Sequence, residues 1–212
     1  DRFPGWETVN IDASFPLDPN LHGHKHRFGK TMPHRFFPDY DSYVYLDPKW
    51  EITREFLLRS KELLSKDSDW ITCRHPDRQS FIAEILFPYY SGTLSFEEIV
   101  YLVNQLNAEN VRFSTFFSSL TTWIVRKDTA RTRQTGERWF DLLCKCYRNH
   151  VRDQIVFPFA VCSQSDIACD LSITDLYDTG VVLNYPNQVR TIAVDWATRY
   201  GELMAFLKKN IS

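Results

Sequence analysis

A single aspartate ends a run of strand-forming residues near the first quarter of the chain. The segment Tyr43–Leu46 contains β-branched and aromatic side chains, and Asp47 follows it directly, before Pro48. In open α/β sheets, ligands bind beyond the carboxyl ends of the strands, and carboxylate oxygens are the ligands that Mg²⁺ prefers. Asp47 is therefore a candidate metal ligand. The alternative is a turn acid, because Asp-Pro commonly ends a strand and starts a helix.

Basic residues follow two other segments that the sequence predicts to be strands. The segment His75–Arg78 (HPDR) comes after one of them, and Arg126 and Lys127 end the other. We expect residues 74–78 and 126–127 to lie at the same edge of the sheet as Asp47. An acid that can hold a divalent cation beside several bases is typical of a diphosphate site. For the HPDR segment, an ordinary loop with an internal Asp–Arg pair is the alternative.

Three consecutive polar residues, Arg152, Asp153 and Gln154, open an apolar segment. Polar side chains at the start of a helix satisfy exposed backbone N–H groups, so capping is one interpretation of Asp153. The other interpretation is that Asp153 is a general base, or that it binds a substrate hydroxyl.

Three histidines, His22, His24 and His26, stand at alternate positions near the N-terminus. An extended segment would place their imidazoles on one side, and Zn²⁺ accepts imidazole ligands. A loop rich in Gly, Lys and Pro is more typically solvated, so the spacing leaves both a zinc site and a solvated loop open.

The elements that must position these residues alternate along the chain. Strands are expected at 42–47, 69–75 and 121–127, and helices at 51–66, 80–90, 96–110, 136–150 and 194–209. A break is expected at 88–92 because of Pro88 and Gly92. Alternating strands and helices predict an α/β fold with a largely parallel sheet.

Composition bounds the class of protein. The chain has 212 residues, is 43% hydrophobic and carries a formal net charge of −2, which argues against non-specific nucleic-acid binding. We expect a single domain over residues 1–212, cut from a longer chain. Five scattered cysteines suit a reducing compartment, and no run of about 18 apolar residues predicts a membrane span, so a soluble cytoplasmic protein is expected. No GxGxxG or GxxxxGK[ST] motif is present.

Several of these segments together resemble a known family. The order FGKTMPHRFFPDYDSYVYLDPKWEI, HPDR, a downstream Glu84 and RDQ is similar to GT-A-type glycosyltransferases, in particular a glycosyltransferase-like family of plants and bacteria. In format the chain is also similar to the N-terminal domain of virus-encoded glycosyltransferases. The resemblance covers roughly residues 37–160. It implies a Rossmann-like, mostly parallel central sheet flanked by helices, and a donor that is a nucleotide sugar.

The resemblance implies a role for each matching residue. Asp47 would bind the metal, Mn²⁺ or Mg²⁺, although Lys49 replaces the usual second acid of the motif. Asp153 would be the catalytic base, which implies inversion at the anomeric carbon; retention is expected if no carboxylate reaches the acceptor. The remaining residues would bind the donor: Lys30, Arg35, Lys49, His75, Arg78, Arg126, Arg152 and Gln154.

Three functions follow as hypotheses. The first is a metal-dependent glycosyltransferase that moves a hexose from a UDP-sugar, with UDP-glucose favoured, to a glycan hydroxyl. The second is a non-catalytic domain that binds a nucleotide sugar or a glycan, which Lys49 favours. The third is a metal hydrolase built on the three histidines and Asp47.

Overall fold

A four-stranded sheet runs through the centre of the computed structural model, which describes residues 9, 25–75, 78–146, 152–163, 168–171, 182–183 and 196–211. The strands are β1 (Ser42–Leu46), β3 (Trp70–Arg74), β4 (Ser119–Lys127) and β5 (Cys169–Asp170), in the order β1-β4-β3-β5. A separate two-stranded ribbon pairs β2 (Trp50–Glu51) with β6 (Val182–Leu183). The three long strands are those that the sequence predicts.

The direction of β4 differs from the prediction. This strand lies between β1 and β3 and pairs antiparallel with both, while among the described strands only β3 and β5 pair in parallel. The α/β class is confirmed, but the largely parallel sheet is not what the described strands form. Alternating elements predict crossover connections, yet a connection through two helices can return the chain in either direction, and β4 returns reversed.

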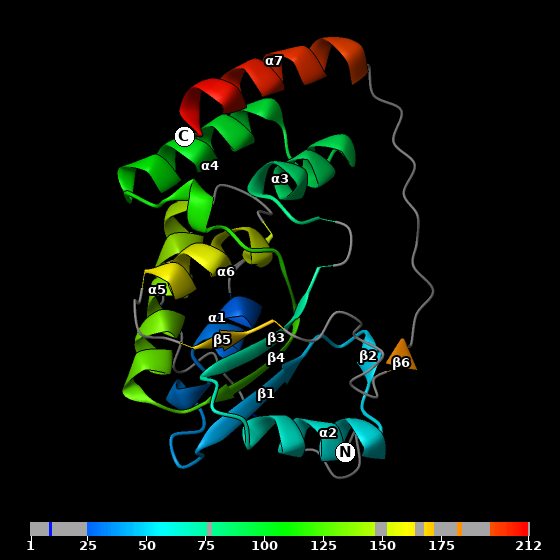
Figure 1. Ribbon diagram of the computed structural model, residues 1–212, viewed down its shortest axis with the longest axis vertical. Coiled ribbons are helices and arrows are strands. Elements are labelled where there is room, and N and C mark those ends of the chain that lie inside the picture. The colour runs from blue at the N-terminus through cyan, green and yellow to red at the C-terminus, as the bar shows by residue number, and fades with distance from the viewer. Residues whose placement is uncertain are drawn as a thin grey trace.

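Helices cover both faces of this sheet, as Figure 1 shows. On one face lie α1 (Lys25–Thr31), α5 (Ala130–Cys146) and α6 (Asp153–Cys162), and on the other lies α2 (Arg54–Leu64). Beyond α6, farthest from α2, lie α3 (Phe81–Tyr90), α4 (Phe96–Ala108) and α7 (Trp196–Asn210). Two short 3₁₀ turns, η3 (Pro33–Arg35) and η4 (Phe113–Thr115), complete the described elements.

Two main apolar cores hold these layers together, and a small third cluster of Phe28, Met32 and Phe140 joins the α1 region to α5. The larger core lies under α5 and α6. The ring centres of Trp139 and Phe157 are 4.7 Å apart there, and the Trp70 ring packs against both. The smaller core lies between the sheet and α2 and includes Phe56 and Trp123. Large buried rings of this kind contribute much of the burial energy, and they fix α6 against the sheet.

The helix boundaries follow local signals. Thr53, Ser80 and Ser95 cap α2, α3 and α4 by accepting backbone hydrogen bonds, and Ser95 forms a complete capping box with Glu98. The break expected at 88–92 is confirmed, because α3 includes Pro88 and ends at Tyr90, within the expected range. The RDQ segment begins α6, with Arg152 as the residue preceding its first turn.

Within the part of the chain that is described, no helix combines the length and the apolar character that a membrane span requires.

Candidate functional site

Asp47 lies where β1 ends, as the sequence predicts. Its backbone N–H donates to the carbonyl of Thr122 on β4 over 2.8 Å, so the residue is anchored to the sheet. Its carboxylate accepts a hydrogen bond of 2.7 Å from the Tyr45 hydroxyl. Burial, and then the Asp47 charge, raise the pKa of Tyr45 well above its ordinary value. The phenol therefore stays protonated and donates this hydrogen bond to the Asp47 carboxylate.

Asp153 reaches the same place from the start of α6. Asp47 and Asp153 both line a pocket of about 520 Å³, together with His26, Arg27, Lys30, Tyr45, Leu46 and Pro48. The Lys30 ammonium, from α1, donates to Oδ2 of Asp153, and the Gln154 backbone N–H donates to Oδ1 over 3.1 Å. The Trp139 indole donates to the Asp153 carbonyl over 3.1 Å, which fixes the first turn of α6 against α5.

The charges around Asp153 keep it ionised. Burial alone would raise the pKa of this carboxyl, but the charge and hydrogen bond of Lys30, with the charge of Arg27, outweigh burial and lower it. Lys30 is itself buried, and its ammonium lies 4.6 Å from the centre of the Tyr45 ring. Lys30 therefore links α1, β1 and α6 at the pocket.

The other described residues of the HPDR and RDQ segments meet in a second cluster around Glu84, on α3. The Arg78 guanidinium lies 2.8 Å from Glu84, the Gln154 amide donates to Glu84, and Arg152 lies 3.8 Å away. His75 contacts Arg78 through its ring, and the Arg78 backbone N–H donates to His75 Nδ1 over 3.2 Å. We call these five residues the Glu84 cluster.

Burial dominates the pKa of Glu84. The side chain is 1% exposed, and burial raises its pKa although Arg78, Arg152 and the Gln154 hydrogen bond act in the opposite direction. The rings and guanidinium groups stack as well, since Arg78 lies 4.1 Å and Arg152 lies 5.1 Å from the centre of the Phe87 ring. The cluster is thus a packed unit that holds two arginines close to the first turn of α6.

Arg126 does not lie with Asp47, and the prediction that it would is wrong. Because β4 runs antiparallel to β1, Arg126 pairs with Tyr43 near the start of β1, whereas Asp47 follows the end of that strand. Its Nη1 donates to the Thr31 carbonyl over 2.7 Å. Gly136 makes room for this contact, because a Cβ at that position would lie 2.2 Å from the same carbonyl oxygen.

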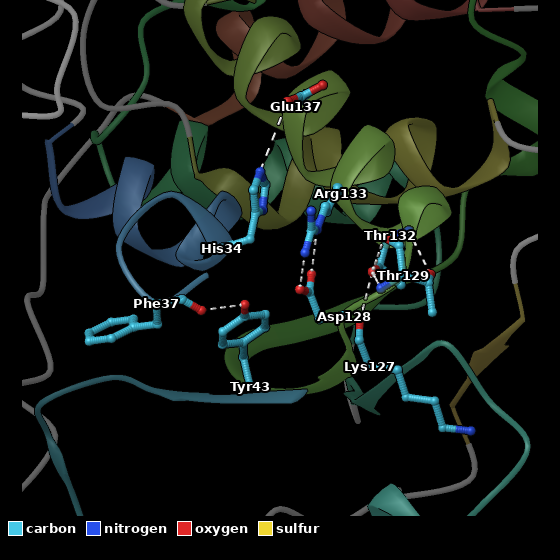
Figure 2. A network of polar contacts seen from close by, with 9 residues as sticks. All are labelled: His34, Phe37, Tyr43, Lys127, Asp128, Thr129, Thr132, Arg133 and Glu137. Atoms are coloured by element: carbon cyan, nitrogen blue, oxygen red, sulfur yellow. Dashed lines mark hydrogen bonds and ion pairs between the residues drawn. The ribbon is translucent and has the colours of Figure 1, made fainter. Parts of the chain in front are cut away.

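Figure 2 shows the polar network near the start of β1 and the end of β4. Asp128, just after β4, accepts hydrogen bonds from Arg133, one of them 2.9 Å long from Nε, and these lower the pKa of Asp128. The Thr132 hydroxyl donates to the Lys127 carbonyl over 2.6 Å and so joins β4 to α5. On the η3 side, His34 faces Glu137 at 4.0 Å.

Two further predicted donor-binding residues lie outside the pocket. Arg35 is exposed and pairs with Glu137 on α5 over 2.9 Å. Lys49 is also exposed, and its ammonium lies 5.6 Å from the centre of the Trp50 ring. Of the eight predicted donor-binding residues, the structure thus brings Lys30 to the pocket and His75, Arg78, Arg152 and Gln154 to the Glu84 cluster.

The predicted zinc site falls mostly outside the description. His22 and His24 are not among the described residues, while His26 lines the pocket, and its pKa is lowered by burial and then by the Arg27 charge. Among the described residues, no group of three His, Cys, Asp or Glu side chains is placed to hold a metal ion on its own. The HPDR prediction is described only at His75 and Arg78, because residues 76 and 77 lie outside the description.

Residue types and spacing did not predict that Tyr45 belongs to the site, and they gave Glu84 no role of its own. The signal for Tyr45 was present, because residues two apart on a strand point to the same face, which puts Tyr45 beside Asp47. Glu84 had no such local signal, since its partners come from 6 to 70 positions away along the chain.

Comparison of the chain with protein-family models, curated proteins and solved structures finds no significant match.

Proposed function

We propose that the chain is a metal-dependent glycosyltransferase that transfers a hexose from a UDP-sugar to a glycan hydroxyl. The observation that carries the proposal is that Asp47 and Asp153, from opposite halves of the sequence, line one pocket beside Lys30 and Arg27. Two carboxylates next to two cations suit two substrates together, a donor that carries a metal-bound diphosphate and an acceptor whose hydroxyl is deprotonated.

The residues of the pocket fit a hard divalent cation such as Mn²⁺ or Mg²⁺. Mg²⁺ is commonly held by one or two carboxylates together with substrate phosphates, and does not need a complete protein cage. Asp47 would be the protein ligand, oriented by the Tyr45 hydroxyl. When bound, the cation offsets negative charge on the departing nucleoside diphosphate. The Lys49 ammonium lies over the Trp50 ring, and Lys49 does not line the pocket, so it does not occupy the place of a cation beside Asp47.

The residues of the chain supply the rest of the chemistry. Asp153 is ionised, so it can accept the proton of an acceptor hydroxyl as that oxygen attacks the anomeric carbon. Arg27, at the pocket wall, is placed to interact with phosphate oxygens. The Glu84 cluster fixes Arg152 and Gln154 on either side of Asp153, which positions the base. A base on the acceptor implies inversion at the anomeric carbon.

The proposal includes the fold. Helices on both faces of a central sheet, with the metal-binding aspartate at the end of a strand, are compatible with a GT-A-like domain. The described sheet has mixed strand directions, whereas the resemblance implies a mostly parallel sheet.

One observation favours the second function, a domain that binds a nucleotide sugar or a glycan without turnover. Lys30 hydrogen-bonds to Asp153, and a paired carboxylate is a weaker base than a free one. Binding without transfer under conditions that saturate donor and acceptor would favour this alternative.

The test is calorimetric titration of the chain with a panel of UDP-sugars, with and without Mn²⁺. We expect binding that requires Mn²⁺ and that Asp47→Ala abolishes, because the variant removes the metal ligand. Glu51→Ala is the matched control, since Glu51 is an exposed acid four positions away that does not line the pocket. Binding that is independent of metal, or unchanged in Asp47→Ala, would refute the assignment.

A further inference from the structure

A second pocket, of about 340 Å³, lies between α1, η3 and the β1–β4 pair. Its size falls within the range of roughly 300–1,000 Å³ that is typical of small-molecule sites. Its lining residues are Gly29, Lys30, Pro33, Phe37, Tyr40, Ser42, Tyr43, Val44, Tyr45, Ile124 and Arg126. We call it the aromatic pocket. Lys30 and Tyr45 also line the pocket of Asp47 and Asp153, so the two pockets are neighbours.

Arg126 gives the aromatic pocket a buried positive charge. The residue is 4% exposed, and its Nη2 atom has no hydrogen-bond partner among the described residues. Its guanidinium carbon lies 4.7 Å from the centre of the Trp70 ring and 5.5 Å from that of Tyr43. Burial lowers the pKa of Arg126 to about 9, because charge is costly where water is excluded. A buried cation of this kind favours an anionic partner.

The nearby acids are already paired with other groups. Asp128 accepts from Arg133, and Glu137 pairs with Arg35. In Figure 2 Asp128 is turned toward Arg133 on α5. Among the described residues that line the aromatic pocket, none is Asp or Glu. Lys30, the other charged residue of the described lining, is bound to Asp153. An anion entering this pocket would therefore meet Arg126 as the cation that no lining carboxylate pairs with.

The mouth of the aromatic pocket is apolar. Phe37, Tyr40 and Val44 are among the large hydrophobic side chains that remain exposed, and all three line it. The rings of Phe37 and Tyr40 meet edge to face with centres 6.1 Å apart. The Tyr43 hydroxyl donates to the Phe37 carbonyl over 2.8 Å, which holds the loop against β1. Aromatic faces of this kind suit the C–H face of a sugar ring.

We propose that the aromatic pocket is the acceptor subsite, and that it selects an acidic sugar, a pyranose ring that bears a carboxylate. The aromatic side chains contact the ring, and Arg126 binds the carboxylate. The shared residues Lys30 and Tyr45 place the bound acceptor next to Asp153, the proposed base. The inference rests on the proposed glycosyltransferase function for its role as an acceptor site, while the binding itself can be measured without a donor.

The experiment titrates the full chain with tri-galacturonate and with the neutral trisaccharide of galactose, without nucleotide sugar or metal. We expect the acidic trisaccharide to bind at least about tenfold more tightly, because a charge-assisted hydrogen bond to a buried guanidinium is made by the carboxylate alone. Arg126→Gln should remove this preference. Galacturonate and benzoate as competitors distinguish a sugar acid from any ring carboxylate, and displacement by benzoate alone would overturn the assignment to sugars.

Arg126 is buried, so a second variant guards against loss of the fold. Tyr40 is 60% exposed, and Tyr40→Ala should weaken acidic trisaccharide binding by about fivefold through lost ring contact, with an unchanged melting temperature. Tyr200→Ala is the control, because Tyr200 is also an exposed tyrosine but lies on α7 and does not line the pocket. Equal binding of the two trisaccharides, no binding of either, or equal effects of the two tyrosine variants would overturn the inference.

The outcomes separate this inference from the proposed function. Binding of a UDP-sugar without binding of the acidic trisaccharide would leave the glycosyltransferase standing and remove this acceptor. Binding of the acidic trisaccharide without any UDP-sugar binding would keep the aromatic pocket as an acidic-sugar site and refute the donor proposal.

Discussion

Asp153 and Glu84 are both carboxylates enclosed by positively charged side chains, yet the structure shifts their pKa values in opposite directions. The pKa of Asp153 is lowered because Lys30 and Arg27 outweigh burial, whereas that of Glu84 is raised because burial outweighs its two arginines. The side chain with the lowered pKa is also the more exposed one, since Asp153 is 19% exposed and Glu84 is 1% exposed. The carboxylate that faces a pocket is the one whose pKa is lowered.

The comparison separates chemistry from positioning. Arg152, Asp153 and Gln154 are consecutive, but Asp153 turns to the pocket of Asp47 while its two neighbours turn to Glu84. The first turn of α6 is therefore held from one side by the Glu84 cluster and presents its acid on the other. We expect Asp153 to act on the substrate and Glu84 to act through α6.

The largest expected effect is on kcat and comes from replacing each of the two carboxylates in turn. Asp153→Asn should lower kcat by about a thousandfold, the usual scale for loss of a general base, with little change in the KM for the UDP-sugar. Glu84→Gln keeps the shape and the hydrogen bond to Gln154, so we expect only about a tenfold loss. Steady-state kinetics of sugar transfer measure both, and equal losses in the two variants would contradict the separate roles.

The next effect concerns the cation that sets the pKa of Asp153. Lys30→Met should destabilise the fold by about 3 kcal/mol, because it leaves a largely buried carboxylate without its partner. Urea denaturation at neutral pH gives the free energy of unfolding. Lys49→Met is the matched control, since Lys49 is exposed and forms no ion pair among the described residues, and should unfold like the unmodified chain. A Lys30→Met variant as stable as this control would show that the pair contributes nothing.

The smallest effect is a difference in how stability depends on pH. The pKa of Glu84 is raised in the folded chain, so its stabilising contribution is present below the ordinary glutamate pKa and is lost as pH rises through the raised value. The pKa of Asp153 is lowered, so its contribution is present above the ordinary aspartate pKa and is lost as pH falls through the lowered value.

Urea denaturation of the unmodified chain, Glu84→Gln and Asp153→Asn between pH 3 and 8 measures these contributions. Relative to the unmodified chain, Glu84→Gln should gain stability as pH rises above the ordinary glutamate value, and Asp153→Asn should lose it as pH rises from strongly acidic values. Parallel curves for the two variants would mean that both carboxylates lie in equivalent environments.

Sequence reasoning located the pieces of the site more reliably than their arrangement. The β-branched and aromatic residues of Tyr43–Leu46 predicted β1, and the position of Asp47 at its end is confirmed. The place of Arg126 was predicted wrongly, because a strand's direction depends on which neighbour it pairs with, and that pairing is a long-range interaction. The link between Lys30 and Asp153 joins residues 123 positions apart, which no local pattern encodes.

By itself, the sequence predicted the three long strands and the helices α2, α3, α4, α5 and α7, and where an acid or a base interrupts them. Periodicity, capping residues and turn residues act over a few positions, so they can be read locally. Only the tertiary structure decided that β4 runs antiparallel to β1 and β3, that Asp153 and Asp47 line one pocket, and that Arg126 lines a separate pocket. These outcomes depend on how buried faces pack across the whole chain, because the sheet must cover its apolar side chains with α2 on one face and α5 and α6 on the other.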